Sequence, residues 1–254
     1  MKLKHLFSIS ILVILTACSV NPATGEQQFT MFMSPEQEAR IGAVEHEKIM
    51  QLFGGLVKDE KLQNYVESIG EKLTPFTERQ DVEYKFFILD TPIVNAFAAP
   101  GGYIYVTRGL VGLANSEAEL ASVIGHEIGH ITGRHSAERY SQSVLASLGT
   151  AILSSAVDKQ GVGDIAQLGS KLYISSYSRE QENEADELGV RYISRAGYEE
   201  MAASQFLNTL FRHSQLEQRI LGRQGQGGFD FFATHPRTEE RVARADNIAR
   251  MSPN

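Results

Sequence analysis

The chain has few cysteines and no run of basic residues. Its single cysteine excludes a disulfide framework and a zinc cluster built from cysteines. Its 24 lysines and arginines against 31 aspartates and glutamates give a formal net charge of −7, which argues against a nucleic-acid partner. Seven prolines and 22 glycines without a period exclude a fibrous or disordered chain. The 254 residues, 42% of them hydrophobic, suit one globular domain.

The one cysteine, Cys18, ends a segment typical of a secretory signal, with two lysines before an apolar run. That run is too short to span a bilayer about 30 Å thick as a helix. Leu-Thr-Ala-Cys at 15–18 is similar to a bacterial lipobox. We therefore expect residues 1–17 to be a signal peptide, Cys18 to be lipidated and 18–33 to be a tether. The alternative is a plain signal peptide with an incidental cysteine.

The residue after the cysteine is Ser19, where an aspartate would indicate retention in the inner membrane. The resemblance to a lipobox thus implies an outer-membrane anchor, with the protein facing the periplasm. No later stretch of 18 apolar residues occurs, so we expect the rest of the chain to lie outside the membrane. Its acidic surface would not bind anionic lipid, which leaves the acyl chains as the anchor.

Strand patterns in the first half give way to helix patterns in the second. Helices are predicted from Ser34 toward Gly54, over 59–73, from Ser116 with a capping box to Glu119, and at about 137–156, 164–176, 180–195, 199–213 and 237–250. A strand is predicted at 84–89, a hairpin at 95–107 and a glycine-rich loop at 222–230. This order predicts a single α+β domain over 34–254.

The helix that begins after Ser116 contains His126-Glu127-Ile128-Gly129-His130, the pattern H-E-x-x-H. Four residues turn a helix by about 400°, so both imidazoles lie on one face and can share a metal ion. Glu127 would lie beside that metal, where it can take a proton from water. Two unpaired histidines in an otherwise apolar helix are the costlier alternative. The pattern predicts a catalytic zinc site.

A catalytic zinc normally has three protein ligands. A metzincin pattern would place the third at Ser136, and His135 falls one residue short, which makes that route weak. Glu182 and Asp186 are four residues apart and share a helix face. Glu182 can be the third ligand, while Asp186 can accept the other ring N–H of a ligand histidine. Taken alone, these acids would be a solvated helix face.

H-E-x-x-H followed by E-x-x-A-D resembles the HtpX- and BepA-like zinc metallopeptidases, relatives of the CAAX prenyl proteases. The likeness runs from about residue 34 to 250 and includes Asn95-Ala96 before Pro100-Gly101-Gly102, Glu117-x-Glu119-Leu120, and His235-Pro236 with Arg241. It implies a mostly helical gluzincin fold with a small antiparallel sheet beside the active-site helix. It also implies one Zn²⁺ per chain, with ligands His126, His130 and Glu182, Glu127 as general base and acid, and Asp186 supporting a ligand.

The same resemblance places His235 near the zinc. There it would either stabilise the oxyanion or fill the open position in a latent form, unless its role is purely structural. Arg241 is either an anchor of the last helix or a substrate contact, and His135 a surface or core residue. The chain is most similar to the short periplasmic lipoprotein type, so we expect neither the transmembrane helices of the HtpX and CAAX enzymes nor the repeat domain of BepA-like proteins.

These patterns predict a zinc endopeptidase of the cell envelope that cleaves unfolded or misassembled proteins. The alternative is an outer-membrane chaperone or assembly factor that carries zinc and whose cleavage is minor or latent. We expect an extended substrate to add to the strand at 103–107, because backbone pairing does not depend on sequence. The residues expected to contact substrate are Asn95, Ala96, Ala98, Tyr103 and Tyr105, with an ordinary hairpin as the alternative.

Overall fold

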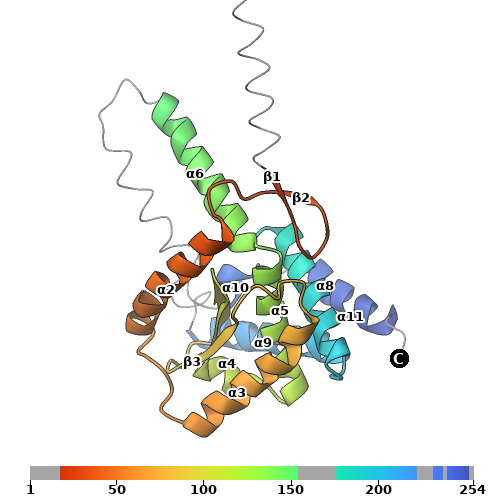
Figure 1. The fold of residues 1–254 in the computed structure, drawn as a ribbon. Helices are drawn as coiled ribbons and strands as arrows, with labels where there is room; N and C mark the ends of the chain where they lie inside the picture. The colour runs from red at the N-terminus through yellow and green to blue at the C-terminus, as the bar shows by residue number, and fades with distance from the viewer. Residues whose placement is uncertain (1–17, 154–175, 222–230, 237–238, 252–254) are drawn as a thin grey trace, which may run out of the picture.

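The structure is a computed structural model that describes residues 18–153, 176–221, 231–236 and 239–251 (Figure 1). The strands are β1 (Cys18–Val20), β2 (Gln27–Phe29), β3 (Lys85–Leu89), β4 (Ala96–Ala99) and β5 (Tyr103–Thr107). The helices are α2 (Pro35–Leu52), α3 (Glu60–Leu73), the 3-10 turn η1 (Thr74–Phe76), α4 (Arg108–Leu113), α5 (Glu117–Thr132), α6 (His135–Leu153), α8 (Arg179–Arg195), α9 (Met201–Leu221), α10 (Phe231–Thr234) and α11 (Glu239–Met251). The predicted α+β, mostly helical fold is confirmed.

Helix starts follow the predicted capping residues. Ser34 caps α2 through a complete capping box with Gln37, and Ser116 caps α5 by accepting a hydrogen bond from the N–H of Glu119. The capping box predicted at Ser116 is only half formed. The Glu119 carboxylate turns instead to Asn115, accepting from its backbone N–H at 2.8 Å and from its side-chain amide at 3.0 Å. Residues 164–175 of the helix predicted at 164–176 and the loop at 222–230 lie outside the described residues, and Ser176 is not helical.

The central sheet has the order β3-β5-β4. The β4–β5 hairpin is antiparallel as predicted, with Phe97 opposite Tyr105. β3 pairs with β5 in parallel, with Lys85 opposite Tyr103, so the sheet is mixed rather than wholly antiparallel. The cause is the chain path, because β5 returns from the hairpin into the space between β4 and β3.

This order makes β5 the central strand, with neighbours on both sides. A substrate strand cannot add to it, so the predicted role of 103–107 is wrong. Tyr103 and Tyr105 are buried instead in an aromatic cluster under α2, where the Tyr105 hydroxyl lies 2.8 Å from His46 Nδ1. β4 is an edge strand, because no strand of the described ranges pairs with its outer side.

The segment expected to be a tether forms a short hairpin that packs on the domain. β1 and β2 pair antiparallel, and Asn21 Oδ1 shapes the turn by accepting from the N–H of Ala23 at 2.8 Å. Beyond the hairpin, the N–H of Phe32 donates to Ser141 Oγ of α6 at 3.1 Å, and Met33 is fully buried. Residues 18–33 therefore differ from a loose linker, because polar and apolar contacts with α6 and α8 hold them.

Helix α5 lies between the sheet and α8, near the centre of the fold (Figure 1). Two glycines on one face of α5, Gly125 and Gly129, contact α8 so closely that a Cβ at Gly129 would lie 3.0 Å from the Ala185 Cα. A Cβ at Gly189 of α8 would lie 2.9 Å from the backbone nitrogen of His126. These absent side chains let the two helices approach, which carries Glu182 to the histidines of α5. No helix within the described ranges is long and apolar enough to cross a membrane.

Candidate metal centre

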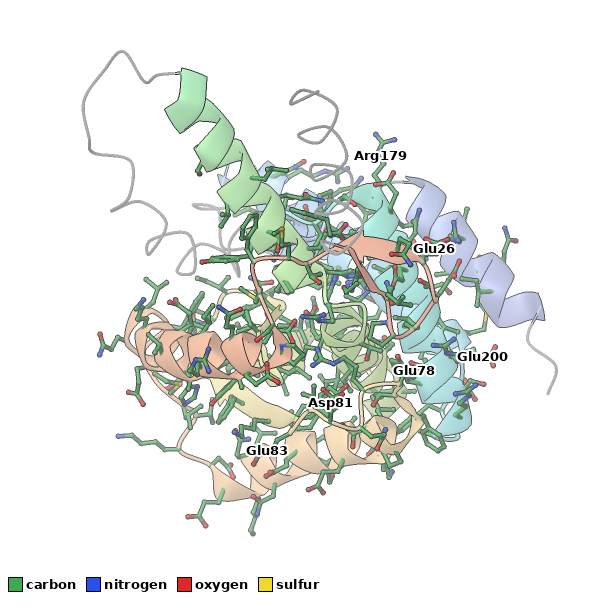
Figure 2. The ribbon with its side chains drawn as sticks, turned by 45° about the horizontal axis from the view of Figure 1, so that its top comes forward. Glu26, Glu78, Asp81, Glu83, Arg179 and Glu200 are labelled. Carbon is green, nitrogen blue, oxygen red and sulfur yellow. The ribbon has the colours of Figure 1, made fainter. Side chains whose placement is uncertain are left out.

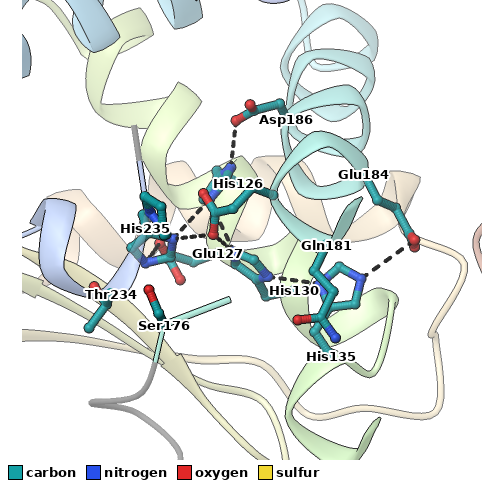
Figure 3. Close-up of polar contacts among 12 residues, drawn as sticks. His126, Glu127, His130, His135, Ser176, Gln181, Glu184, Asp186, Thr234 and His235 are labelled. Carbon is teal, nitrogen blue, oxygen red and sulfur yellow. Dashed lines mark hydrogen bonds and ion pairs between the residues drawn. The ribbon is translucent and has the colours of Figure 1, made fainter. Parts of the chain in front are cut away.

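Four buried side chains from three segments converge on one point. His126 and His130 come from α5, Glu182 from α8 and His235 from the residue after α10, and their ligand atoms all lie within 4.8 Å of one another. His126 Nε2 is 3.1 Å from His130 Nε2 (Figure 3). His130 Nε2 is in turn 3.4 Å from Glu182 Oε1. The three ligands predicted from the sequence are thus brought together, and His235 joins them.

The donor atoms fit a bound cation. His126 Nδ1 lies 2.9 Å from Asp186 Oδ1 (Figure 3), and an ionised carboxylate can only accept, so Nδ1 carries the ring proton. His126 Nε2 then presents its lone pair to the cluster. Imidazole nitrogens and a carboxylate oxygen that face one another are a typical zinc donor set.

Charge and burial favour the ligand forms of His130 and Glu182. Burial lowers the pKa of His130 well below its ordinary value, which keeps the ring neutral. Burial would raise the pKa of Glu182, but the adjacent His235 and His130 hold it well below its usual range. Glu182 is therefore ionised and His130 neutral, as metal coordination requires.

Asp186 is itself held by Arg241. The Arg241 guanidinium donates to both Asp186 oxygens, at 2.7 and 2.8 Å, and also contacts Glu182. Burial would raise the pKa of Asp186, but Arg241 lowers it. Arg241 further donates to the carbonyl of Pro236, directly after His235, at 3.1 Å. Of the two roles open for Arg241, these contacts favour the anchor, because they join α11 to the metal centre.

Glu127 is fully buried beside the cluster, with Oε1 3.4 Å from His235 Nε2. Burial raises the pKa of the Glu127 carboxyl, while His235, His126 and the backbone N–H of Ala98 act in the opposite direction. The net shift is upward, so the carboxylate is a stronger base than an exposed glutamate. Its place next to the ligands, rather than among them, matches the predicted position of the general base.

His235 enters the cluster through a fixed backbone. Its N–H donates to the carbonyl of Phe231 at 2.8 Å, and the N–H of Phe231 donates to Val94, just before β4, at 3.1 Å. The ring stacks on Phe231 and places Nδ1 2.9 Å from Glu182 Oε1 and 3.2 Å from His126 Nε2. His235 therefore stands where a fourth ligand would stand.

The expected substrate residues separate into two groups. Tyr103 and Tyr105 lie in the aromatic cluster described above, away from the metal centre. Ala96 and Ala98 lie on edge strand β4, beside α5. Asn95 precedes them, and its backbone N–H and carbonyl both bond the side chain of Thr107, at 3.0 and 2.9 Å.

The pairing fixes which peptide groups of β4 face outward. The N–H of Thr107 donates to the carbonyl of Asn95, and hydrogen-bonded pairs alternate along antiparallel strands. The peptide groups of Ala96 and Ala98 therefore point to the outer edge, away from β5. The effect of the Ala98 N–H on Glu127 agrees, because it places this donor on the side of the active-site helix.

Sequence reasoning missed several neighbours of His130. The ring of Tyr177 stacks on the His130 ring, with centroids 3.6 Å apart. The Arg139 guanidinium lies over the Tyr177 ring, 3.7 Å from its centroid. His135 is not among the four converging groups and contacts His130 from the far side. This contact depends on the backbone of the turn after α5, which the spacing of the two histidines does not specify.

A family model described as Peptidase family M48 matches residues 60–249. The chain belongs to this family. The predicted resemblance is confirmed, and with it a zinc metallopeptidase domain whose four converging groups could bind one metal ion. The match covers α5, α8 and His235, which are the segments that build the centre.

Named relatives agree with this membership. The beta-barrel assembly-enhancing protease of Escherichia coli (strain K12) is 27% identical over 268 residues, which cover 98% of this chain and 53% of the relative. The putative beta-barrel assembly-enhancing protease of Vibrio cholerae is 31% identical over 210 residues, 78% of this chain and 41% of the relative. The mitochondrial metalloendopeptidase OMA1 of Arabidopsis thaliana is 33% identical over 163 residues, 64% of this chain and 31% of the relative. The chain thus spans about half the length of the bacterial relatives, or less.

Proposed function

We propose that the protein is a zinc-dependent endopeptidase of the bacterial cell envelope that cleaves unfolded or misassembled proteins. The observation that carries the proposal is Glu127, a buried carboxylate with a raised pKa directly beside three metal ligands. A purely structural zinc site has no use for such a base. The names of the bacterial relatives, beta-barrel assembly-enhancing proteases, support both the activity and the location.

The residues divide the work of peptide hydrolysis. Zinc, when bound by His126, His130 and Glu182, supplies a Lewis acid that acidifies water and polarises a carbonyl. Glu127 takes a proton from the water that attacks the carbonyl carbon, and returns it to the nitrogen as the C–N bond breaks. Asp186 keeps the proton of His126 on Nδ1, so that Nε2 remains a ligand.

The substrate binds along the outer edge of β4. Ala96 and Ala98 direct their peptide groups to this edge. Both residues are buried, so an incoming chain must displace the atoms that cover them. Pairing through the backbone selects an extended segment rather than a particular sequence. This requirement favours unfolded proteins, because folded ones seldom expose an unpaired strand.

The proposed location is the outer membrane, facing the periplasm. It rests on the signal-like segment 1–17 and on Cys18 as a lipidated residue. The packed hairpin at 18–33 would hold the domain close to the lipid anchor, because few residues separate Cys18 from the contacts with α6 and α8. Mass spectrometry of the mature protein tests this, and an unmodified Cys18 would contradict it.

The purified full-length protein should degrade unfolded casein, lose this activity to a zinc chelator and regain it when zinc is returned. Glu182→Ala should lower the bound zinc below one ion per chain. Cleavage that survives complete zinc removal would refute the proposal. Glu182→Ala with a full complement of zinc would refute the ligand set.

A second candidate is a zinc-bearing chaperone or assembly factor whose cleavage is latent. The position of His235 favours it, because a fourth protein ligand closes the site that a catalytic zinc keeps open. Both ideas predict zinc binding, but they differ for His235→Ala. A latent peptidase should cleave casein faster when the fourth ligand is removed. A slower rate would instead indicate that His235 stabilises the oxyanion.

A further inference from the structure

The second ligand histidine is supported by another histidine. His130 Nδ1 lies 2.8 Å from His135 Nδ1, on the side of the ring opposite the metal centre (Figure 3). Both rings are almost completely buried, at 1% exposure each. A ligand histidine usually gives its second nitrogen to a carboxylate or a carbonyl, which orients the ring. Here an imidazole takes that place.

The contacts continue from His135 to the N-terminal hairpin. His135 Nε2 lies 3.5 Å from Glu184 Oε2, and the other Glu184 oxygen accepts from Asn21 Nδ2 at 2.7 Å. Asn21 is 5% exposed, at the turn between β1 and β2. Figure 2 shows Glu26 of the same hairpin beside α8, so the hairpin and this helix lie together.

One arrangement of protons fits the contacts of His130, His135 and Glu184. If His130 Nε2 is to face the metal with its lone pair, His130 Nδ1 must carry the proton and donate to His135 Nδ1. The proton of His135 then lies on Nε2, the nitrogen nearest Glu184. Glu184 Oε1 accepts from Asn21 Nδ2, which can only donate, and Glu184 Oε2 makes an electrostatic contact with His135 Nε2 at 3.5 Å. The path from hairpin to ligand is thus consistent at every step.

The end of α5 has an unusual backbone that brings His135 back to His130. Arg134 has a φ of 55°, a left-handed conformation that a side chain seldom adopts. Its guanidinium is held there by Glu38 Oε1 at 2.9 Å and by the carbonyl of Met33 at 2.8 Å. At Gly133 a Cβ would lie 2.4 Å from His135 Nε2, so only glycine leaves the ring its place.

We propose that the N-terminal hairpin is a positioning element of the metal centre, acting through Asn21, Glu184 and His135 on the ligand His130. The hairpin lies before residue 60, where the match to the family model begins. The proposal rests on the proposed zinc site, and it makes zinc affinity depend on a segment directly after the expected lipid anchor. None of the three positioning residues touches the metal.

Zinc affinity of the full-length protein, measured by chelator competition, tests the first step. His135→Ala should weaken zinc binding by about 10- to 100-fold, the usual cost of losing a ligand's hydrogen-bond partner. His135→Asn should restore most of that loss, because its Oδ1 takes the position of Nδ1 and can accept from His130. Equal affinity of His135→Ala and the wild type would overturn the proposal, and so would a failure of His135→Asn to improve on His135→Ala.

Asn21→Asp tests the hairpin itself. The carboxylate keeps the acceptor for the N–H of Ala23 but removes the donor to Glu184 and places a second negative charge there. Zinc affinity should fall by about threefold to tenfold, whereas Gln27→Ala, an exposed change in the same hairpin, should have no effect. Equal affinity of Asn21→Asp and the wild type would overturn the role of the hairpin. A wild-type protein that binds no zinc would refute the proposed function instead, so the two failures are distinguishable.

Discussion

The two histidines of α5 are one turn apart, yet the protein holds them in different ways. His126 contacts the carboxylate of Asp186 directly, and Arg241 grips that carboxylate with two hydrogen bonds. His130 reaches a carboxylate only through His135, and the path ends at the N-terminal hairpin. A direct support keeps its partner charge buried and paired, whereas the relayed support spreads over three segments. The support of His126 by Asp186 and Arg241 should therefore matter more for the stability of the fold. The support of His130 through His135 should let changes in the hairpin alter zinc affinity.

Removal of Arg241 should give the largest effect. Arg241→Ala leaves the buried carboxylates of Asp186 and Glu182 without their cation, which should lower the free energy of unfolding by about 3–5 kcal/mol. Urea unfolding of the zinc-free protein measures this. Arg244→Ala on the same helix is the control, because its side chain is 42% exposed and should matter by less than about 0.5 kcal/mol. Equal stability of the two variants would mean that Arg241 does not anchor the centre.

The two carboxylates should differ in their effect on zinc. Asp186→Asn removes the charge that touches a ligand ring at 2.9 Å, and should weaken zinc binding by about 10- to 100-fold. Glu184→Gln acts through His135 across 3.5 Å, and should weaken binding less. Chelator competition on both variants gives the order. A larger loss of zinc affinity in Glu184→Gln than in Asp186→Asn would mean that the indirect support of His130 matters more than the direct support of His126.

The double variant Asp186→Asn/Glu184→Gln tests whether the supports are independent. Each change acts on a different ligand ring, so the losses in zinc-binding free energy should add to within about 0.5 kcal/mol. The same competition assay gives the coupling energy. A coupling well above that value would show that the two histidines move as one unit.

Two glycine substitutions should give the smallest effects. They separate the packing around His135 and Glu184 from the helix propensity of glycine. Gly133→Ala places a methyl group against His135 and Glu184, and should weaken zinc binding by a few-fold. Gly112→Ala in α4 meets no atom within 4 Å and should stabilise the fold by about 0.5–1 kcal/mol. Zinc competition and urea unfolding on both variants make the comparison. Unchanged zinc affinity in Gly133→Ala would argue against close packing between Gly133, His135 and Glu184.

Local spacing predicted most of the metal centre. His126 and His130 share one face of α5, and Glu182 and Asp186 share one face of α8. Each pair is four residues apart, a spacing that the sequence alone specifies. The role of Arg241 was left open between an anchor and a substrate contact, because Arg241 reaches Asp186 from a separate helix. The role of His135 was also out of reach, because it depends on the left-handed backbone at Arg134 and on a hairpin far away in the sequence.

The fold shows the same division. Capping residues predicted the starts of α2 and α5, since a cap is a local contact. The position of β5 between β3 and β4 was not predictable from alternation, because strand order depends on how the chain crosses the sheet. The expected tether became a hairpin for a similar reason, since its short strands gain stability only from contacts with α6 and α8.

The central claim is that Glu127 is the base of a zinc endopeptidase. The most direct measurement compares casein cleavage by the zinc-loaded wild type and by Glu127→Gln, with zinc content and unfolding measured on both. The account predicts equal zinc and a cleavage rate lower by at least about 100-fold in the variant. Cleavage by Glu127→Gln at the rate of the wild type would contradict it.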